Sequence, residues 1–175
     1  MNILALDLGT NTGWARGNSK GLFQTETWKL AADKSLRDAK KFRMDRKLDI
    51  RVSCLVDNLV SLHKAEKIDL LVWEDIRFGK SLAQVQLWSS FRGAVWMFAH
   101  IHGIQTDCLE TGKLKKFATG SGGALKPQMA AALVQQDSRF RLDNGAVRDT
   151  LTDELLTDDA VDAIHLFRWA LTLVK

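Results

Sequence analysis

A short apolar run that ends in a carboxylate and a turn is the feature that most constrains the fold. The run covers residues 1–6, Asp7 follows it, and a turn extends from Leu8 to Gly13 before a second extended segment begins near Trp14. This pattern predicts two strands joined by a turn, with Asp7 at a strand end. A charged side chain at the end of a buried strand costs free energy unless it is paired with another charge or binds a metal ion. Asp7 is therefore a candidate for a functional site at the edge of a sheet.

Two later segments carry acids in comparable places. Glu74 closes the apolar run Ile68–Trp73, and Asp159 and Asp162 open the last predicted helix. Residues three apart on a helix point the same way, but so do residues four apart, so spacing alone also allows Asp158 with Asp162. Acidic residues are also common at helix N-termini because they complement the helix dipole, and this alone would explain acids there without any catalytic role. Carboxylates on three separated elements nevertheless favour a divalent-metal site, because hard cations bind carboxylate oxygens.

The rest of the chain alternates helical and extended segments. Three early strands form a meander, the third within Gly21–Leu30, and helices that alternate with single strands follow. This order predicts an α/β fold in which helices cover a mixed sheet. Apolar residues recur at helical spacing from Leu48 to about Glu66, and part of Asp137–Leu156 is expected to be helical. The other predicted elements are helices over 81–101, 112–118, 125–136 and 158–173, and strands over 68–73 and 104–109.

Length and composition indicate one soluble domain. A chain of 175 residues can bury its own core, and residues 1–175 are expected to form a single domain. No apolar stretch approaches the roughly 20 residues of a membrane-spanning helix, and the start shows no signal peptide. Cys54 and Cys108 lack metal-ligand spacing and are expected to be buried, reduced thiols, which suits the cytoplasm.

Basic residues gather in two places. The net charge is +4, and one basic cluster covers Lys34–Arg51. The second cluster flanks a glycine-rich loop at 119–123 and consists of Lys113, Lys115, Lys116 and Lys126. Such clusters bind polyanions, although a solvated helix face explains the first one equally well. Acids beside a basic surface favour phosphodiester cleavage assisted by a pair of metal ions.

The predicted helices raise three further expectations. The helix over 81–101 is apolar around most of its circumference, so two of its sides are expected to be buried. A sheet would bury one side and a partner chain the other. Thr157 or Asp158 is the expected N-cap of the closing helix. His165, one turn after Asp162, either joins the acids or packs elsewhere, and packing is the commoner role for such a histidine.

Five segments resemble the RuvC Holliday-junction resolvases of the RNase H-like superfamily. They are the first strand with its metal-binding Asp (3–9), the strand bearing a Glu (73–75), the ungapped spacing to an Arg-Gly pair in the next helix (74–93), a lysine-flanked glycine loop (115–126) and a terminal acid pair (159–163). The resemblance covers most of the chain. It implies an RNase H-like fold with a mixed five-stranded sheet flanked by helices. The last segment also selects Asp159 over Asp158.

The resemblance implies roles for individual residues. Asp7, Glu74, Asp159 and Asp162 would be catalytic and would hold Mg²⁺, with two ions in the site and Mn²⁺ as a substitute. DNA contacts would come from Lys115 and Lys126, with Lys116 and Lys113 ranked second, and from Arg77 and Phe78. An aromatic ring near the junction centre suits stacking on unpaired bases, although a core or interface position explains Phe78 as well.

The implied reaction is the resolution of a four-way DNA junction. A homodimer would bind the junction, and each protomer would cut one strand symmetrically across the crossover, in a bacterial cytoplasm or a phage-infected cell. A branch-migration complex is a further implied partner. Residues 31–50 and 137–157 depart from the family pattern, which leaves open whether flaps or other branched DNA are also substrates.

Three other functions remain as alternatives. Residues 7–13 also resemble the first phosphate loop of actin-like and sugar-kinase ATPases, but those enzymes enclose the nucleotide between two such domains. A YqgF-type nuclease acting on RNA shares the same start and fits the lysine-flanked loop less well. A catalytically inactive DNA-binding module of this fold would have no need of acids at all four positions.

Overall fold

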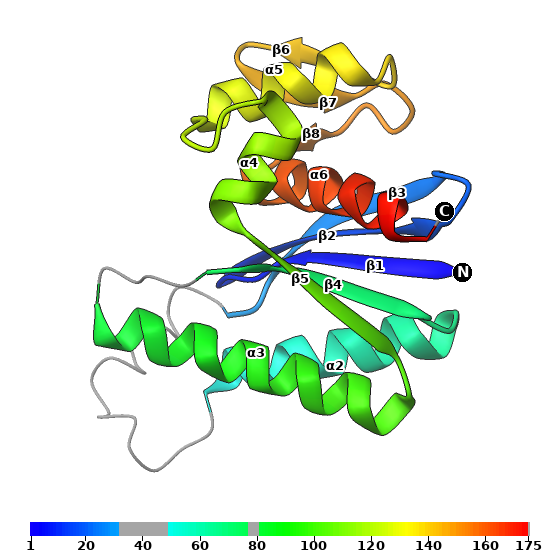
Figure 1. Ribbon diagram of the computed structural model, residues 1–175, viewed down its shortest axis with the longest axis vertical. Helices are drawn as coiled ribbons and strands as arrows, with labels where there is room; N and C mark the ends of the chain where they lie inside the picture. Colours follow the sequence, from blue (N-terminus) through cyan, green and yellow to red (C-terminus); the bar gives the residue numbers. More distant parts are fainter. Residues whose placement is uncertain (32–48, 77–80, 175) are drawn as a thin grey trace.

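The computed structural model describes residues 1–31, 49–76 and 81–174 and is built around a five-stranded sheet (Figure 1). Strands β1 (Asn2–Asp7), β2 (Asn11–Asn18) and β3 (Phe23–Lys29) form an antiparallel meander. Strand β4 (Leu70–Asp75) then pairs in parallel with β1, and β5 (Gln105–Glu110) pairs in parallel with β4. The order β3-β2-β1-β4-β5 confirms the expected mixed sheet.

Helices cover both faces of this sheet. Helices α2 (Ile50–Ala65) and α3 (Leu82–His102) lie on one face (Figure 1). Helices α4 (Thr111–Thr119) and α6 (Asp158–Leu173) pack on the other face, and α5 (Lys126–Gln136) packs against both of them. The architecture is therefore a three-layer α/β arrangement.

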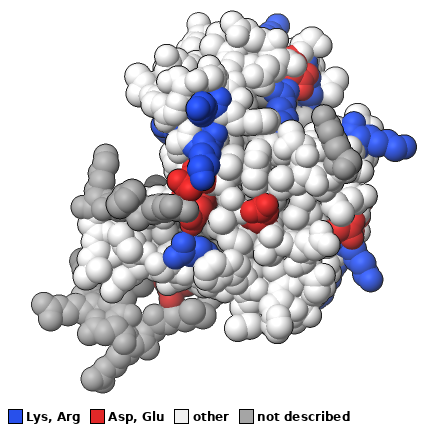
Figure 2. Space-filling view, in the orientation of Figure 1, with Lys and Arg blue, Asp and Glu red and all other residues white. Residues whose placement is uncertain are grey.

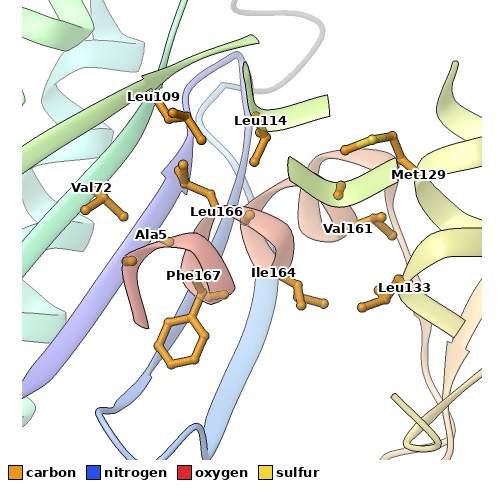
Figure 3. Close-up of a cluster of buried hydrophobic side chains, with 14 of the residues drawn as sticks. Ala5, Val72, Leu109, Leu114, Met129, Leu133, Val161, Ile164, Leu166 and Phe167 are labelled. Atoms are coloured by element: carbon orange, nitrogen blue, oxygen red, sulfur yellow. The ribbon is translucent and has the colours of Figure 1, made fainter. Parts of the chain in front are cut away.

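Alternation along the strands divides the core between the two faces. Successive strand side chains point to opposite sides, so Ala5 and Val72 face the α6 side and belong to the same buried cluster as Phe167 (Figure 3). Leu6 and Trp73 face the other way and join the cluster under α2 and α3. Figure 3 shows side chains from the sheet, α4, α5 and α6 converging on one interior. Each polar residue at a strand end is thereby assigned to a defined face.

Local signals in the sequence determine where the helices begin and end. The Ser81 hydroxyl accepts the Gln84 N–H at the start of α3, and Gly103 ends this helix with φ 64°, a left-handed conformation that favours glycine. The Thr157 hydroxyl accepts the Ala160 N–H, so Thr157, one of the two expected candidates, is the N-cap of α6. Within the described residues, none of the helices is long and apolar enough to cross a bilayer.

The expectation of helix within Asp137–Leu156 is wrong, because this segment forms a second sheet. Strands β6 (Phe140–Asp143), β7 (Ala146–Asp149) and β8 (Leu155–Leu156) are antiparallel neighbours. The β6–β7 connection is the two-residue turn Asn144-Gly145, with φ 50° and 86°. Positive φ at both positions matches the twist of a hairpin, which is why Asn-Gly turns connect strands.

Burial of both cysteines is also contradicted. Cys108 is exposed and Cys54 is only partly buried, and neither forms a disulfide within the described residues. The reason for Cys108 is its position on β5, which among the described strands is paired with β4 alone and whose residues 105–108 are all exposed. Strand β5 therefore forms an edge of the five-stranded sheet that lies at the protein surface.

Candidate functional site

The pairing of β1 with β4 brings Asp7 and Glu74 together. The last registered pair of these parallel strands is Leu6 with Trp73, so Asp7 and Glu74 lie one residue beyond it at the same edge. Both follow the alternation of Ala5 and Val72, which places their side chains on the α6 side of the sheet. Two carboxylates 67 positions apart in the sequence are thus neighbours because of strand register alone.

Helix α6 adds a third carboxylate. Its first turns pack against β1 and β2, and one carboxylate oxygen from each of Asp7, Glu74 and Asp162 lies within 4.8 Å of the other two. We call these three residues the carboxylate cluster. Asp159, the fourth predicted acid, is half-buried one turn earlier on α6 and lies outside this group, although its charge raises the pKa of Asp7.

Burial and mutual repulsion raise the pKa values in the carboxylate cluster. Burial, followed by repulsion from Glu74 and Asp162, holds the pKa of Asp7 well above its ordinary value. Burial also raises the pKa of Glu74, and burial with the Glu74 charge raises the pKa of Asp162 to about 7. Buried carboxylates that repel one another form a suitable site for a divalent cation. Its positive charge would offset both the cost of burying the carboxylates and their mutual repulsion.

A hydroxyl that the sequence did not reveal holds one of the acids. Thr111, the first residue of α4, donates a very short hydrogen bond to Glu74 Oε1. It lies there because Leu109 of β5 pairs with Glu74 of β4 and the chain turns into α4 just beyond. No spacing rule links residues 74 and 111, so this contact needed the strand order.

Two of the four predicted lysines face the acids. The charge of Lys115 lowers the pKa of Glu74 and of Asp162, and the charge of Lys126 lowers that of Asp7. Lys126 Nζ also lies 2.8 Å from Asp158 Oδ2. Figure 2 shows basic side chains directly beside acidic ones on this face of the molecule.

The other two lysines are placed differently. Lys113 Nζ pairs with Glu110 Oε1 at 2.8 Å, and Lys116 is exposed at the surface of α4. Among these four lysines, Lys115 and Lys126 are therefore the two whose charges lower the pKa values of the carboxylate cluster.

Asp158 and His165 do not join the carboxylate cluster. Asp158 is exposed and paired with Lys126, so the structure places the 159/162 pair, and not Asp158, on the side of the acids. His165 is fully buried, and its Nε2–H donates to the Met129 carbonyl at 3.0 Å. It is a packed core histidine that links α6 to α5.

Three predicted DNA-binding features lie partly or wholly outside the described residues. Arg77 and Phe78 fall in the segment 77–80, and most of the basic cluster Lys34–Arg51 falls in 32–48. Arg51 is described, and its guanidinium hydrogen-bonds Asp49 and the Thr10 hydroxyl.

Comparison with known proteins identifies the fold. No protein-family model and no curated protein matches the sequence. A solved structure of T. thermophilus RuvC in complex with a Holliday junction substrate aligns at 15% identity with a TM-score of 0.66, over 98% of this chain and 92% of that chain. A T. thermophilus RuvC structure aligns at 17% identity and TM-score 0.61 over the same shares. The yeast mitochondrial Holliday junction resolvase aligns at 14% identity and TM-score 0.53, over 98% and 80%. These likenesses show that the chain has the RuvC fold over nearly its whole length.

Proposed function

We propose that this protein is a metal-dependent endonuclease that resolves four-way DNA junctions by symmetric paired nicks. The observation that carries the proposal is the carboxylate cluster of Asp7, Glu74 and Asp162 at the carboxyl edge of a RuvC-fold sheet. Structures with this fold include a RuvC bound to a Holliday junction substrate. Recombination, repair or the processing of phage DNA is the setting that we assign to this activity.

The acids would hold the metal and position the scissile phosphate. Asp7, Glu74 and Asp162 supply the converging oxygens, and Asp159 extends the site along α6. When bound, a pair of Mg²⁺ or Mn²⁺ ions activates water and stabilises the leaving oxygen in phosphodiester cleavage. Thr111 keeps Glu74 in one orientation through its hydrogen bond. The ionised forms of all the acids are the ones that bind, so metal and protons compete.

The lysines would hold the DNA backbone. Lys115 and Lys126 face the acids and would contact the phosphates on either side of the cut, whereas Lys113 and Lys116 would contact the flanking backbone. Phosphate contacts of this kind fix the register of the DNA and make binding dependent on salt. Phe78 keeps the role expected from the sequence, near the junction centre, and Arg77 stays an expected DNA contact.

A homodimer would supply the second active site needed for paired nicks. Helix α3 buries Phe91, Val95 and Phe98 against the sheet, and its opposite side leaves large apolar side chains exposed. These exposed residues are Leu82, Val85, Trp96, Met97 and Ile101. A second copy of the chain would cover them, and a branch-migration complex would be a further partner on the same DNA.

We further infer a single domain that acts in the cytoplasm of a bacterium or a phage-infected cell. Phe140 and Val147 of the small sheet belong to the same buried cluster as Ile3 and Phe167. Continuous packing of this kind supports one cooperative unit. Cys54 and Cys108 form no disulfide within the described residues, which fits a reducing compartment.

A cleavage assay tests the proposed function. Purified protein is incubated with labelled four-way junction, flap, linear duplex and RNA, with Mg²⁺ or with EDTA, beside an Asp7→Asn control. Paired, metal-dependent nicks across the junction that are absent from the control are the expected result. Cutting of flap or RNA alone would replace the proposal with another nuclease specificity, and binding without cutting would leave a DNA-binding module.

A further inference from the structure

Lys126 lies at the end of α5 that disfavours a positive charge. A helix N-terminus carries a partial positive charge and favours acidic residues in its first turn. Helix α5 begins with Lys126 and has no acidic residue in its first turn. The helix that carries Lys126 therefore does not compensate its charge, and the acids that do so come from another element.

That element is α6, whose first residue is Asp158. Lys126 Nζ donates to Asp158 Oδ2 at 2.8 Å, and this hydrogen bond is the main reason that the pKa of Lys126 lies above its ordinary value. The charges of Asp159 and Asp162 raise this pKa further. Lys126 is thus a cation that is held by Asp158, an acid outside the carboxylate cluster, while it also feels the charges of the acids that would bind metal.

The ion pair of Lys126 and Asp158 is open to solvent. The Lys126 side chain is 68% exposed and the Asp158 side chain is 55% exposed. An exposed ion pair of this kind changes an equilibrium constant by no more than about fivefold, and salt weakens it. A phosphate group can therefore reach Lys126 and replace the carboxylate as its partner without any change in the fold.

We propose that Asp158 competes with DNA for Lys126, so that it holds the lysine in the free protein and is displaced by a backbone phosphate when a strand binds. Every strand that contacts Lys126 then has to break this ion pair, and Asp158 thereby lowers the affinity for DNA. The inference rests on the proposed function, in which Lys126 contacts a phosphate beside the cut. It deepens that function by adding a residue that determines how tightly DNA is held.

Junction binding in an Asp7→Asn background tests the competition, because the DNA then stays intact. Asp158→Asn is expected to raise the affinity for a four-way junction about threefold to fivefold. The slope of log affinity against log salt should become steeper by up to about 1, since no carboxylate is left to take up a cation when the phosphate engages Lys126. Thr157 remains the N-cap of α6 in this variant, and Asp158→Glu, which keeps the charge, should bind like the parent protein.

A control and a second background separate the ion pair from overall charge. Asp57 is an exposed acid on α2, which covers the opposite face of the sheet, so Asp57→Asn should leave the affinity unchanged. In a Lys126→Gln background, Asp158→Asn should have little effect, because the lysine for which it competes is absent. An equal gain in both backgrounds would mean that Asp158 only repels DNA, and a loss of affinity in Asp158→Asn would mean that it only positions Lys126. Either result would overturn the inference.

Cleavage by the protein with intact acids distinguishes this inference from the proposed function. If Asp158→Asn binds junctions more tightly but the wild-type protein with Mg²⁺ cuts none of them, the proposed function fails and the competition stands. If the wild-type protein makes paired nicks but Asp158→Asn leaves the affinity unchanged, the competition fails and the proposed function stands. Absence of junction binding in every variant would overturn both.

Discussion

Gly13 lies directly against the backbone of Asp159. A Cβ atom at position 13 would lie 1.9 Å from the Asp159 carbonyl oxygen and 2.7 Å from Ala160 N, both of which are rigid backbone atoms of α6. Gly13 also pairs with Asp7 across β1 and β2. The missing side chain therefore lets the acidic end of α6 approach the strand that carries Asp7, and the carboxylate cluster depends on this approach.

Gly13→Ala is expected to push α6 away from the sheet and to destabilise the protein by about 1–3 kcal/mol or more, because backbone cannot move aside as a flexible side chain can. Urea unfolding measures the change. Gly123→Ala is the control, since a Cβ there meets nothing within 4 Å, and it should be neutral or slightly stabilising. Equal stability of both variants would show that α6 relaxes freely, contrary to this account.

Thr111→Val is expected to weaken metal binding about 10–100-fold, because residues that orient metal ligands commonly have effects of this size. Valine keeps the shape of threonine but removes the donor to Glu74 Oε1. Mn²⁺ titration followed by electron paramagnetic resonance gives the affinity directly. Thr111→Ser should restore most of it, and unchanged Mn²⁺ affinity in Thr111→Val would show that Glu74 is held by other contacts.

Stability without metal is expected to fall as the pH rises from about 4 to about 7. The pKa of Asp162 is 3.8 unfolded and about 7 folded, so within this window the folded state keeps a proton that the unfolded state has lost. The stabilisation is therefore complete below the unfolded value and is lost as the pH passes the folded one. At about 1.4 kcal/mol per pKa unit, roughly 4 kcal/mol is the upper bound for this residue.

Denaturant unfolding in EDTA at pH 5, 6, 7 and 8 checks this dependence. Asp162→Asn should make the profile flatter, while the raised pKa values of Asp7 and Glu74 leave part of the slope. The lowered pKa values of Asp49 and Asp149 act at pH values below about 4, outside this window. A wild-type profile that is flat from pH 5 to 7 would contradict the raised pKa of Asp162.

Lys115→Gln is expected to weaken junction binding and to reduce the slope of log affinity against log salt by about 1, because one phosphate contact is lost. The measurement is made in an Asp7→Asn background, where the DNA stays intact. Lys20→Gln is the matched control, since Lys20 is exposed in the turn between β2 and β3. A slope that changes equally in both variants would mean that overall charge, and not a contact at the site, determines binding.

Much of the site could be predicted from the sequence because its geometry follows from local patterns. The apolar runs before Asp7 and Glu74 specify strands, and the N-cap Thr157 determines where α6 begins and which way Asp162 points. Asp7 and Glu74 then meet once the parallel pairing of β1 and β4 is assumed, and Asp162 joins them when α6 packs on that face. Periodicity and capping are properties of short segments, so they can be recognised in the sequence without knowledge of the fold.

Other features depended on relations between distant segments. Thr111 reaches Glu74 only because β5 is the neighbour of β4, and Cys108 is exposed on β5, which lies at the edge of the sheet among the described strands. The β6–β7 hairpin is a different case, since Asn144-Gly145 is a strong turn signal. Its strands are short and carry arginines such as Arg148, which pairs with Asp143 at 2.7 Å, so their apolar alternation is weak.

The carboxylate cluster joins residues 7, 74 and 162, and this span has a consequence for synthesis on the ribosome. The strands that carry Asp7 and Glu74 can leave the exit tunnel and pair long before α6 has been translated. Until α6 docks, Asp7 and Glu74 lie at the edge of the sheet without Asp162, the third residue of the carboxylate cluster. A nascent chain would therefore lack the complete carboxylate cluster, and the proposed metal site could form only after α6 has docked on the sheet.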